Sequence, residues 1–219
     1  MIVLLIPVKD PANGKTRLSG LLTPEERRLL AWEMFEDVVQ AAGAATKPDR
    51  IVVVTSFERA GQRAAKAGFD VMIEESQFSE SASVDWASRE LTLAGADAVM
   101  RLPADVPLVT PDDVDELLST SLKSPGALLV PSREGTGTNC IIRTPPDLFP
   151  SRFGPNSLAL HKEEASLAGI NCVVRENFRI SVDIDEPADL ELFTQLGHGT
   201  RTFSLLSEIN SVRQLRGGA

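Results

Sequence analysis

The first eight residues form an almost continuous apolar run, MIVLLIPV, which constrains the fold more than any other stretch of the chain. A strand that is apolar on both faces indicates a central position in a parallel or mixed sheet, with helices covering both sides. Residues 50–55 (RIVVVT) and 127–131 (ALLVP) are also apolar and of strand length, and stretches of helical length separate these runs. Strands that alternate with helices predict an α/β fold with a layered sheet.

Capping residues mark where the first helix begins. Thr23 and Glu26 form a capping box and Pro24 occupies the first helical position, so we expect a helix from here, with apolar residues at helical spacing as far as Ala42. The same reasoning gives the remaining elements. The other expected strands are residues 68–73, 96–102, 138–143, 170–174 and 180–182, and the other expected helices are residues 57–67, 84–94, 111–122, 156–168 and 187–196.

No linker, internal repeat or low-complexity tract divides the chain, so we expect a single domain over residues 1–196. Residues 197–219 form a C-terminal extension that packs on this domain or is partly frayed. Its apolar residues are spaced as in an amphipathic helix: Leu205, Leu206, Ile209, Val212 and Leu215.

The net charge of −9 argues against general binding to nucleic acid or to an anionic membrane, both of which require a basic surface. A small phosphorylated ligand stays compatible with it, because its site needs only a few local cations. No apolar run approaches the roughly 18 residues of a membrane span. Lys9 and Asp10 follow the first run at once, without a signal-peptide cleavage site. We therefore expect a cytoplasmic protein in which Cys140 and Cys172 are reduced core residues.

A single acid stands between two prolines in the stretch Leu102-Pro103-Ala104-Asp105-Val106-Pro107-Leu108. The prolines stiffen the backbone and keep it out of a helix, so Asp105 is presented at the carboxyl end of the preceding strand. Ligands of open α/β sheets bind at that edge. Asp105 could instead cap the next helix, but Thr110 and Pro111 already supply a cap and a first turn there. This favours a functional Asp105.

The loop after the first strand carries three cations, Lys9, Lys15 and Arg17. Lysine offers a point charge and arginine a bidentate fork, so the loop is suited to holding a polyphosphate. Its single glycine excludes a Walker A loop and a dinucleotide-binding fingerprint. The alternative is an ordinary solvated loop.

Two further acids, Asp183 and Asp185, lie two positions apart on a stretch expected to be extended, which places them on one face. Asp185 could also serve as a cap for the helix that follows. If Asp105 and Asp183 converge, their hard oxygen ligands form a Mg²⁺ site, and the phosphates of a substrate complete the coordination shell.

Two segments combine glycines with hydroxyls or amides, residues 135–139 (GTGTN) and 152–157 (RFGPNS). Gly154 and Ser157 stand at the start of an expected helix, where free backbone N–H groups bind anions. The alternative is a pair of ordinary turns. His161 is expected to be structural or solvated, and both tryptophans, Trp32 and Trp86, are expected to pack in the core rather than to stack on a base.

Taken together, five motifs occur in a fixed order: I-P-V-K-x-P-x-x-G-K-T-R-L, L-P-A-D-V-P-L, G-T-G-T-N, R-F-G-P-x-S-x-x-x-H and D-I-D-E-P. This set resembles the guanylyltransferases that act on 2-phospho-L-lactate or phosphoenolpyruvate in the biosynthesis of the deazaflavin coenzyme F420. The resemblance covers residues 1 to about 195. It implies a single-domain GT-A-type nucleotidyltransferase fold, with a mixed, mostly parallel sheet and helices on both faces.

The resemblance also implies roles for individual residues. Those that would handle the triphosphate or promote the reaction are Lys9, Lys15, Arg17 and Asp105. The metal ligands implied are Asp105, Asp183 and Asp185. The residues implied to grip the phosphorylated acid are Asn139, Gly154 and Ser157.

One stretch departs from the family pattern. Relatives usually carry a Gly-Leu-Asn-x-Ala motif that faces the nucleotide, whereas this chain has Ser83-Val84-Asp85-Trp86-Ala87 there. Asp85 thus takes the place of an asparagine at a substrate-binding position. The departure is compatible with a subgroup that uses another acceptor, such as 3-phosphoglycerate.

The expected ligands are therefore GTP, Mg²⁺ and a small phosphorylated three-carbon acid, with no nucleic acid, no membrane and at most a homo-oligomer as assembly. The acceptor's phosphate attacks the α-phosphorus of GTP and pyrophosphate leaves. One alternative is a cytidylyl-, adenylyl- or molybdopterin-type nucleotidyltransferase, although those usually carry a Gly-rich loop after the first strand. A second alternative is a non-catalytic nucleotide-binding regulator, which the retention of Asp105, Asp183 and Lys15 disfavours.

Overall fold

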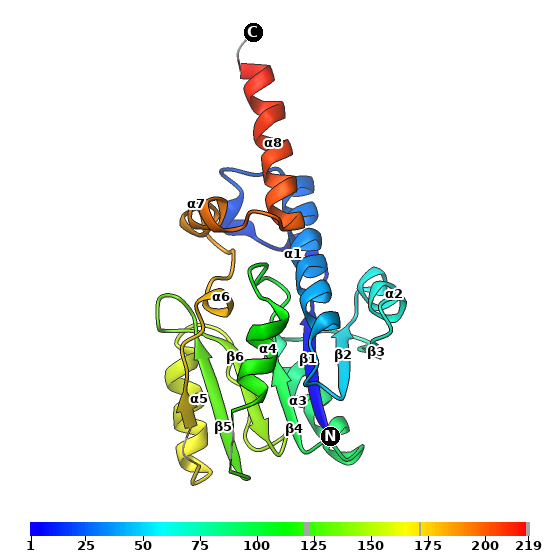
Figure 1. Cartoon of the computed structure of the whole chain (residues 1–219), viewed down its shortest axis with the longest axis vertical. Coiled ribbons are helices and arrows are strands. Elements are labelled where there is room, and N and C mark those ends of the chain that lie inside the picture. Colours follow the sequence, from blue (N-terminus) through cyan, green and yellow to red (C-terminus); the bar gives the residue numbers. More distant parts are fainter. Residues whose placement is uncertain (121–122, 171, 218–219) are drawn as a thin grey trace.

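A computed structural model describes residues 1–120, 123–170 and 172–217 of the chain (Figure 1). Its centre is one mixed sheet, whose described strands have the order β3-β2-β1-β4-β6-β5-β7. Neighbouring strands are parallel except around β6, which runs antiparallel to both β4 and β5. The strands are β1 (Ile2–Val8), β2 (Arg50–Thr55), β3 (Asp70–Ile73), β4 (Ala98–Arg101), β5 (Gly126–Pro131), β6 (Thr138–Thr144) and β7 (Cys172–Val174).

Helices cover both faces of this sheet, and two single turns, η1 (Pro11–Asn13) and η2 (Thr16–Leu18), shape the loop after β1. The mixed, mostly parallel sheet with helices on both faces is as the sequence predicts. The helices are α1 (Pro24–Ala44), α2 (Glu58–Lys66), α3 (Glu80–Leu93), α4 (Pro111–Leu118), α5 (Ser157–Leu167), α6 (Phe178–Ser181), α7 (Pro187–Leu196) and α8 (Arg201–Gly217).

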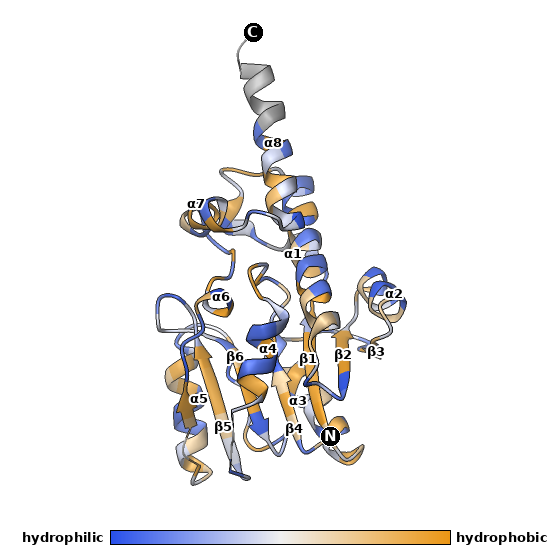
Figure 2. Ribbon diagram, viewed as in Figure 1, coloured by the Kyte–Doolittle hydropathy of each residue, from blue (hydrophilic) through white to orange (hydrophobic). Residues whose placement is uncertain are grey.

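Strand β1 separates two apolar layers, as its run of apolar residues predicts. Leu4 and Ile6 pack in a cluster with residues of α1, α2 and α4, whereas Val3 and Leu5 pack in a second cluster with residues of α3. Figure 2 shows the apolar strands at the centre and polar residues on the outer sides of the helices. Because β1 is buried on both faces, its carboxyl end is held in a fixed place.

A third apolar cluster joins the C-terminal extension to the first half of α1. Leu206 and Ile209 of α8 pack with Leu30 of α1 and Phe193 of α7. The carboxylate of Asp37 caps α8, because it accepts hydrogen bonds from the backbone N–H groups of residues 201 and 202. The side chains of Val212 and Leu215, predicted to continue the apolar face, lie outside those that the structure describes.

The strand predicted over residues 180–182 is wrong, because residues 178–181 form the short helix α6. The side chain of Asn177 caps this turn and accepts a hydrogen bond from the N–H of Ile180. Ile180 is buried in this helical turn, and a short apolar run is equally compatible with a buried strand, so the pattern did not distinguish the two.

Other boundaries also differ from the prediction. Helix α3 begins at Glu80, four residues before the predicted start at 84, because Ser79 caps it by accepting a hydrogen bond from Ala82 N. Pro7 lies inside β1, opposite Val54. Part of the helix predicted over residues 111–122 lies outside the described residues, and α4 ends at Leu118.

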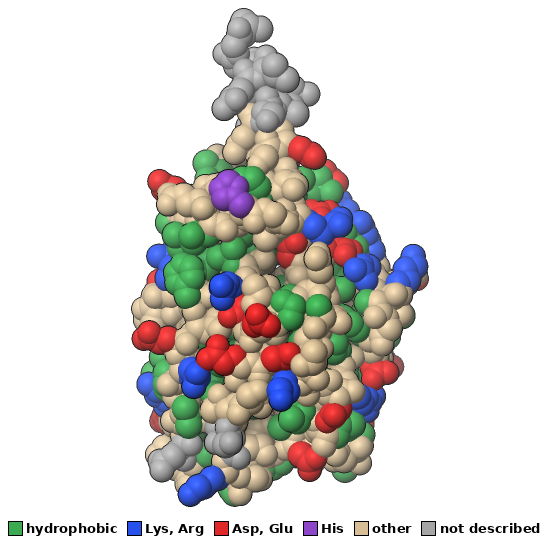
Figure 3. All heavy atoms as spheres, viewed as in Figure 1, with side chains coloured by type: hydrophobic (Ala, Val, Ile, Leu, Met, Phe, Trp, Pro, Cys, Tyr) green, Lys and Arg blue, Asp and Glu red, His purple; other side chains and the backbone are tan. Residues whose placement is uncertain are grey.

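The described surface carries both signs of charge. On the face shown in Figure 3, acidic and basic side chains are interspersed, without a continuous basic area among the described residues. None of the described helices combines the length and the hydropathy that crossing a membrane requires.

Candidate active site

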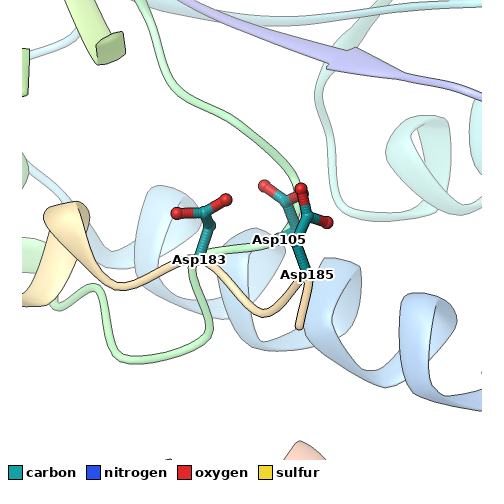
Figure 4. Close-up of side chains that lie close together, drawn as sticks. All are labelled: Asp105, Asp183 and Asp185. Carbon is teal, nitrogen blue, oxygen red and sulfur yellow. The ribbon is translucent and has the colours of Figure 1, made fainter. Parts of the chain in front are cut away.

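Three carboxylates converge at the carboxyl end of β4, as Figure 4 shows. Asp105 follows β4, and Asp183 and Asp185 lie on the segment between α6 and α7. One oxygen of each carboxylate lies within 4.8 Å of an oxygen of the other two. The two segments are joined by a 3.3 Å hydrogen bond from Ile184 N to the carbonyl oxygen of Asp105. The side chain of Ile184 is fully buried, so its two acidic neighbours face the opposite way, towards Asp105.

Neither Asp105 nor Asp185 serves as a helix cap. Thr110 caps α4 and forms a capping box with Asp113, while Glu186 and Asp189 form the corresponding box of α7. The capping alternatives are thereby excluded.

Lys15 places its ammonium group between two of the three acids. Its Nζ lies 2.7 Å from Asp105 Oδ2 and 2.6 Å from Asp185 Oδ1, and only 10% of the side chain is exposed. Gly14 precedes it, and Lys15 itself adopts a left-handed backbone with φ +53°, which turns the loop back towards the acids. Burial alone would lower the pKa of Lys15, but the two carboxylates outweigh it and raise that pKa.

The two better buried acids respond differently to the same surroundings. Burial would raise the pKa of Asp105, but the adjacent Lys15 ammonium holds it below its ordinary value. Burial and repulsion by Asp105 together raise the pKa of Asp183 to about 6, although a hydrogen bond from the Asn139 amide opposes this rise. At neutral pH the carboxylates of Asp105 and Asp183 are therefore acceptors for a cation.

The donor set fits a hard divalent cation. It consists of carboxylate oxygens alone, which Mg²⁺ and Ca²⁺ prefer, and the site already stabilises one positive charge, the Lys15 ammonium. Asp105, Asp183 and Asp185 are the residues that could hold such an ion.

A cavity of about 360 Å³ opens beside the triad, over the carboxyl ends of β1 and β4. Its charged lining residues are Lys9, Asp10, Lys15, Glu80, Arg101, Asp105 and Asp185, and its apolar ones include Trp32, Phe35, Phe57 and Pro103. The mixture of apolar walls and convergent charges is typical of a site for a small charged ligand.

The cavity brings together only some of the predicted site residues. Lys9 lines it; its side chain is half-exposed and its Nζ lies 3.9 Å from Glu80 Oε2. Arg17 is exposed and pairs with Glu186 at 3.1 Å. Asn139 lies behind the triad, where its side-chain amide contacts Asp183.

The remaining predicted residues lie on the side of α3 and α5. Asp85 accepts hydrogen bonds from Ser151 N at 3.0 Å and pairs with the buried Arg143 at 3.3 Å. The hydroxyl of Ser157 accepts a 2.8 Å hydrogen bond from Thr138 N. Gly154 precedes α5 with φ +130°, a conformation that favours glycine.

Sequence reasoning missed three charged residues of the cavity, Asp10, Glu80 and Arg101. Arg101 is buried at the end of β4, and its guanidinium contacts the carboxylate of Glu80 in the first turn of α3. The sequence held one signal for Arg101, because this residue interrupts an otherwise apolar strand just before Asp105.

Comparison with known proteins agrees with this architecture. Residues 2–217 match the model of the family described as "Guanylyl transferase CofC like". The chain belongs to this family. Its members are guanylyltransferases, and the predicted resemblance is confirmed.

Several CofC-like relatives match most of the chain. A phosphoenolpyruvate guanylyltransferase from Rubrobacter xylanophilus is 33% identical over 86% of this chain and 91% of its own. A 3-phospho-D-glycerate guanylyltransferase from Colwellia psychrerythraea is 31% identical over 88% and 91%, respectively. A 2-phospho-L-lactate guanylyltransferase from Methanoregula boonei is 36% identical over 90% and 82%. The relatives thus differ in the acceptor that they are named for.

Among solved structures, a putative nucleotide-diphospho-sugar transferase from Desulfovibrio desulfuricans superposes with a TM-score of 0.76. It shares 18% identity, and the match covers 97% of both chains. This likeness confirms the nucleotidyltransferase fold predicted for the CofC-like chain.

Proposed function

We propose that this CofC-like protein transfers GMP from GTP to the phosphate of a small phosphorylated three-carbon acid and releases pyrophosphate. The observation that carries the proposal is the convergence of Asp105, Asp183 and Asp185 around the Lys15 ammonium at the mouth of the cavity. The names of the relatives suggest phosphoenolpyruvate, 2-phospho-L-lactate or 3-phosphoglycerate as acceptors. We place the reaction in the cytoplasm and in the biosynthesis of coenzyme F420.

The reaction needs charge neutralisation more than proton transfer. An oxygen of the acceptor's phosphate forms a bond with the α-phosphorus of GTP, and the bond to the bridging oxygen breaks, so that pyrophosphate leaves with the electron pair. The attacking oxygen is already anionic, and no general base is required. The protein must instead bring two anions together.

The chain's own cations suit this task. Lys15 is held by the acids at the mouth of the cavity and Lys9 lines its wall, so both can donate hydrogen bonds to phosphate oxygens. We assign Arg17, which is exposed on the same loop, to the outer phosphates of the triphosphate. Mg²⁺, held by Asp105, Asp183 and Asp185, would supply positive charge to the phosphates when bound.

A pyrophosphate-release assay tests the proposal directly. Each nucleoside triphosphate is paired with each of the three candidate acids, and we expect release only with GTP and one or more of them. Release with CTP or ATP in place of GTP would contradict the guanylyl specificity, and silence with every pair would favour a non-catalytic binding protein.

Asp105→Asn tests the role of the triad. We expect turnover to fall by at least about a hundredfold, equivalent to about 3 kcal/mol, because a preorganised charge is lost at the reacting phosphates. Asp112→Asn, an exposed change at the start of α4, is the matched control and should leave turnover unchanged. Near-normal kinetics in folded Asp105→Asn would exclude the metal assignment.

A further inference from the structure

Arg101 is a buried cation in the wall of the cavity, and the proposed reaction has not yet used it. Its side chain is 6% exposed, yet it lines the cavity beside Lys9 and Asp105. One face of the guanidinium lies 4.3 Å from the centre of the Phe153 ring, and Nη1 donates a 2.6 Å hydrogen bond to the carbonyl oxygen of Asn139. The group is therefore held rigidly in one orientation.

Its other terminal nitrogen, Nη2, donates to the carboxylate of Glu80. The second oxygen of that carboxylate lies 3.9 Å from Lys9 Nζ, so Glu80 is placed between two cations of the cavity. Within the described part of the chain, Arg101 Nε has no hydrogen-bond partner. The guanidinium is thus not saturated by the protein alone.

Arg101 and Glu80 differ in how tightly the protein restrains their side chains. Arg101 cannot move without losing its contacts with Phe153 and Asn139, whereas Glu80 is 24% exposed and stands in the first turn of α3, next to solvent. A buried guanidinium requires an anionic partner, but that partner does not have to be Glu80. A phosphate or a carboxylate of a ligand has the same geometry towards the fork of an arginine.

The other cations of the cavity are also paired with carboxylates of the protein. Lys15 is neutralised by Asp105 and Asp185, and Lys9 and Arg101 share Glu80. In this form the cavity has no unpaired cation among its described lining residues to receive a polyanion. A ligand with several negative charges therefore competes with these internal carboxylates for the cations of the cavity.

We propose that Glu80 is a displaceable internal anion and that Arg101, together with Lys9, binds an anionic group of a substrate when Glu80 turns away. Arg101 is then a substrate-binding residue, and Glu80 sets the affinity by competing with the substrate. The identity of the substrates rests on the proposed function, but the competition between carboxylate and ligand does not. The shared chemistry is a phosphate or a carboxylate, either from the triphosphate or from the phosphorylated acid.

The test uses the purified full chain in a chelating buffer and measures thermal stability with and without two probes, inorganic pyrophosphate and phosphoenolpyruvate. Glu80→Gln removes the charge but keeps the shape. We expect its melting temperature to be lower without a ligand, because Arg101 is left unpaired, and its rise on adding a probe to exceed that of the unmodified protein. Its dissociation constant for that probe should fall about tenfold.

Glu36→Gln is the matched control. Glu36 forms a largely buried pair with Arg63 between α1 and α2, at 2.8 Å and outside the cavity. This variant should lose stability without any change in the response to either probe. Equal responses in Glu80→Gln and Glu36→Gln would overturn the proposal and leave the Glu80–Arg101 pair as a purely structural link between α3 and β4.

Two more variants complete the design. Arg101→Gln should bind the probe more weakly, by about tenfold. If the variant loses affinity for pyrophosphate alone, Arg101 is assigned to the triphosphate; if it loses affinity for phosphoenolpyruvate alone, Arg101 is assigned to the acceptor. Glu80→Asp shortens the reach of the carboxylate towards Arg101 and should show a smaller gain in affinity for the probe. This variant provides the test if Glu80→Gln does not fold. If no pair of substrates reacts in the pyrophosphate-release assay, the proposed function is contradicted. The binding measurements still test the competition between Glu80 and a ligand, because they do not depend on turnover.

Discussion

The side-chain amide of Asn139 donates a 2.9 Å hydrogen bond to Asp183 Oδ1. The same nitrogen lies 3.0 and 3.1 Å from the carbonyl oxygens of Ile180 and Ser181, so one side chain of β6 holds the segment that carries Asp183. This contact gives Asn139 a positioning role behind the triad, beside the substrate-binding role that the family resemblance implies.

Asn139→Leu should weaken metal binding by about tenfold or more, because a partner that orients a ligand usually contributes that much. Loss of the amide also removes the hydrogen bond that opposes the raised pKa of Asp183. A Mn²⁺ titration of the free protein measures the effect. Asn177→Ala is the control, since Asn177 caps α6 without touching Asp183. Equal losses in both variants would show that only the backbone of α6 matters.

The main features of the site were predictable because they are local. Asp105 between two prolines, the cationic loop and the two acids two positions apart are all visible in the sequence, and strand order brings Asp105 and the cationic loop to one edge of the sheet. The apolar runs likewise predicted the strands, because burial on both faces leaves a plain signal.

The rest depends on contacts between distant segments. Glu80 faces Arg101 because α3 begins over the end of β4, and nothing in either residue's neighbours indicates this pairing. The same is true of Asp85, because its partners, Ser151 N and Arg143, come from another part of the chain. The helical turn at residues 178–181 depends on one capping side chain, which outweighs the apolar pattern.

Lys15→Met should make the free protein less stable, by about 1–3 kcal/mol, because Asp105 and Asp185 are left facing each other without the ammonium between them. The same change should increase the stabilisation by millimolar Mg²⁺, since a divalent cation then has no competitor at these oxygens. Thermal unfolding with and without Mg²⁺ measures both effects.

Lys162→Met on the exposed side of α5 controls for the change in net charge. It should alter neither the stability nor the response to Mg²⁺. A response to Mg²⁺ in Lys15→Met no larger than in this control would mean that Lys15 and a metal do not share the site.

His161 should make the fold sensitive to acid. The ring is fully buried, its Nε2 accepts a 2.8 Å hydrogen bond from Arg152 N, and its Nδ1 lies 3.0 Å from Thr138 Oγ1. An acceptor at Nε2 requires the neutral ring with its proton on Nδ1. Burial, reinforced by the nearby charges of Arg143 and Arg101, lowers the pKa of His161 to about 4.

Because the pKa is lower in the folded state than in the unfolded chain, the unfolded chain binds the additional proton first. Stability is therefore lost as the pH falls from about 6.5 to about 4, by roughly 3 kcal/mol from this group. His161→Gln keeps an acceptor for Arg152 N but does not titrate, so denaturant unfolding of this variant should show a smaller loss over that range. If stability falls equally with pH in the unmodified protein and in His161→Gln, His161 is not the group that causes the loss.

Gly197 should tolerate no side chain, although its backbone is ordinary. It ends α7 with φ −79°, so alanine there has no conformational penalty. A Cβ atom would lie only 2.4 Å from Cζ of Phe193, however, and Phe193 is fully buried in the cluster that joins α7 and α8 to α1. The ring must shift, and such overpacking typically costs about 1–3 kcal/mol.

Denaturant unfolding of Gly197→Ala measures this loss, and Gly20→Ala is the matched control because a Cβ there has no heavy atom within 4 Å. Gly20→Ala should be neutral or slightly stabilising, since it only restricts the unfolded chain. Triad geometry should survive in Gly197→Ala, because the cluster lies on the far side of Ile184 from the carboxylates. A loss of metal binding that matches the loss of stability would instead show that the position of α7 controls Asp185.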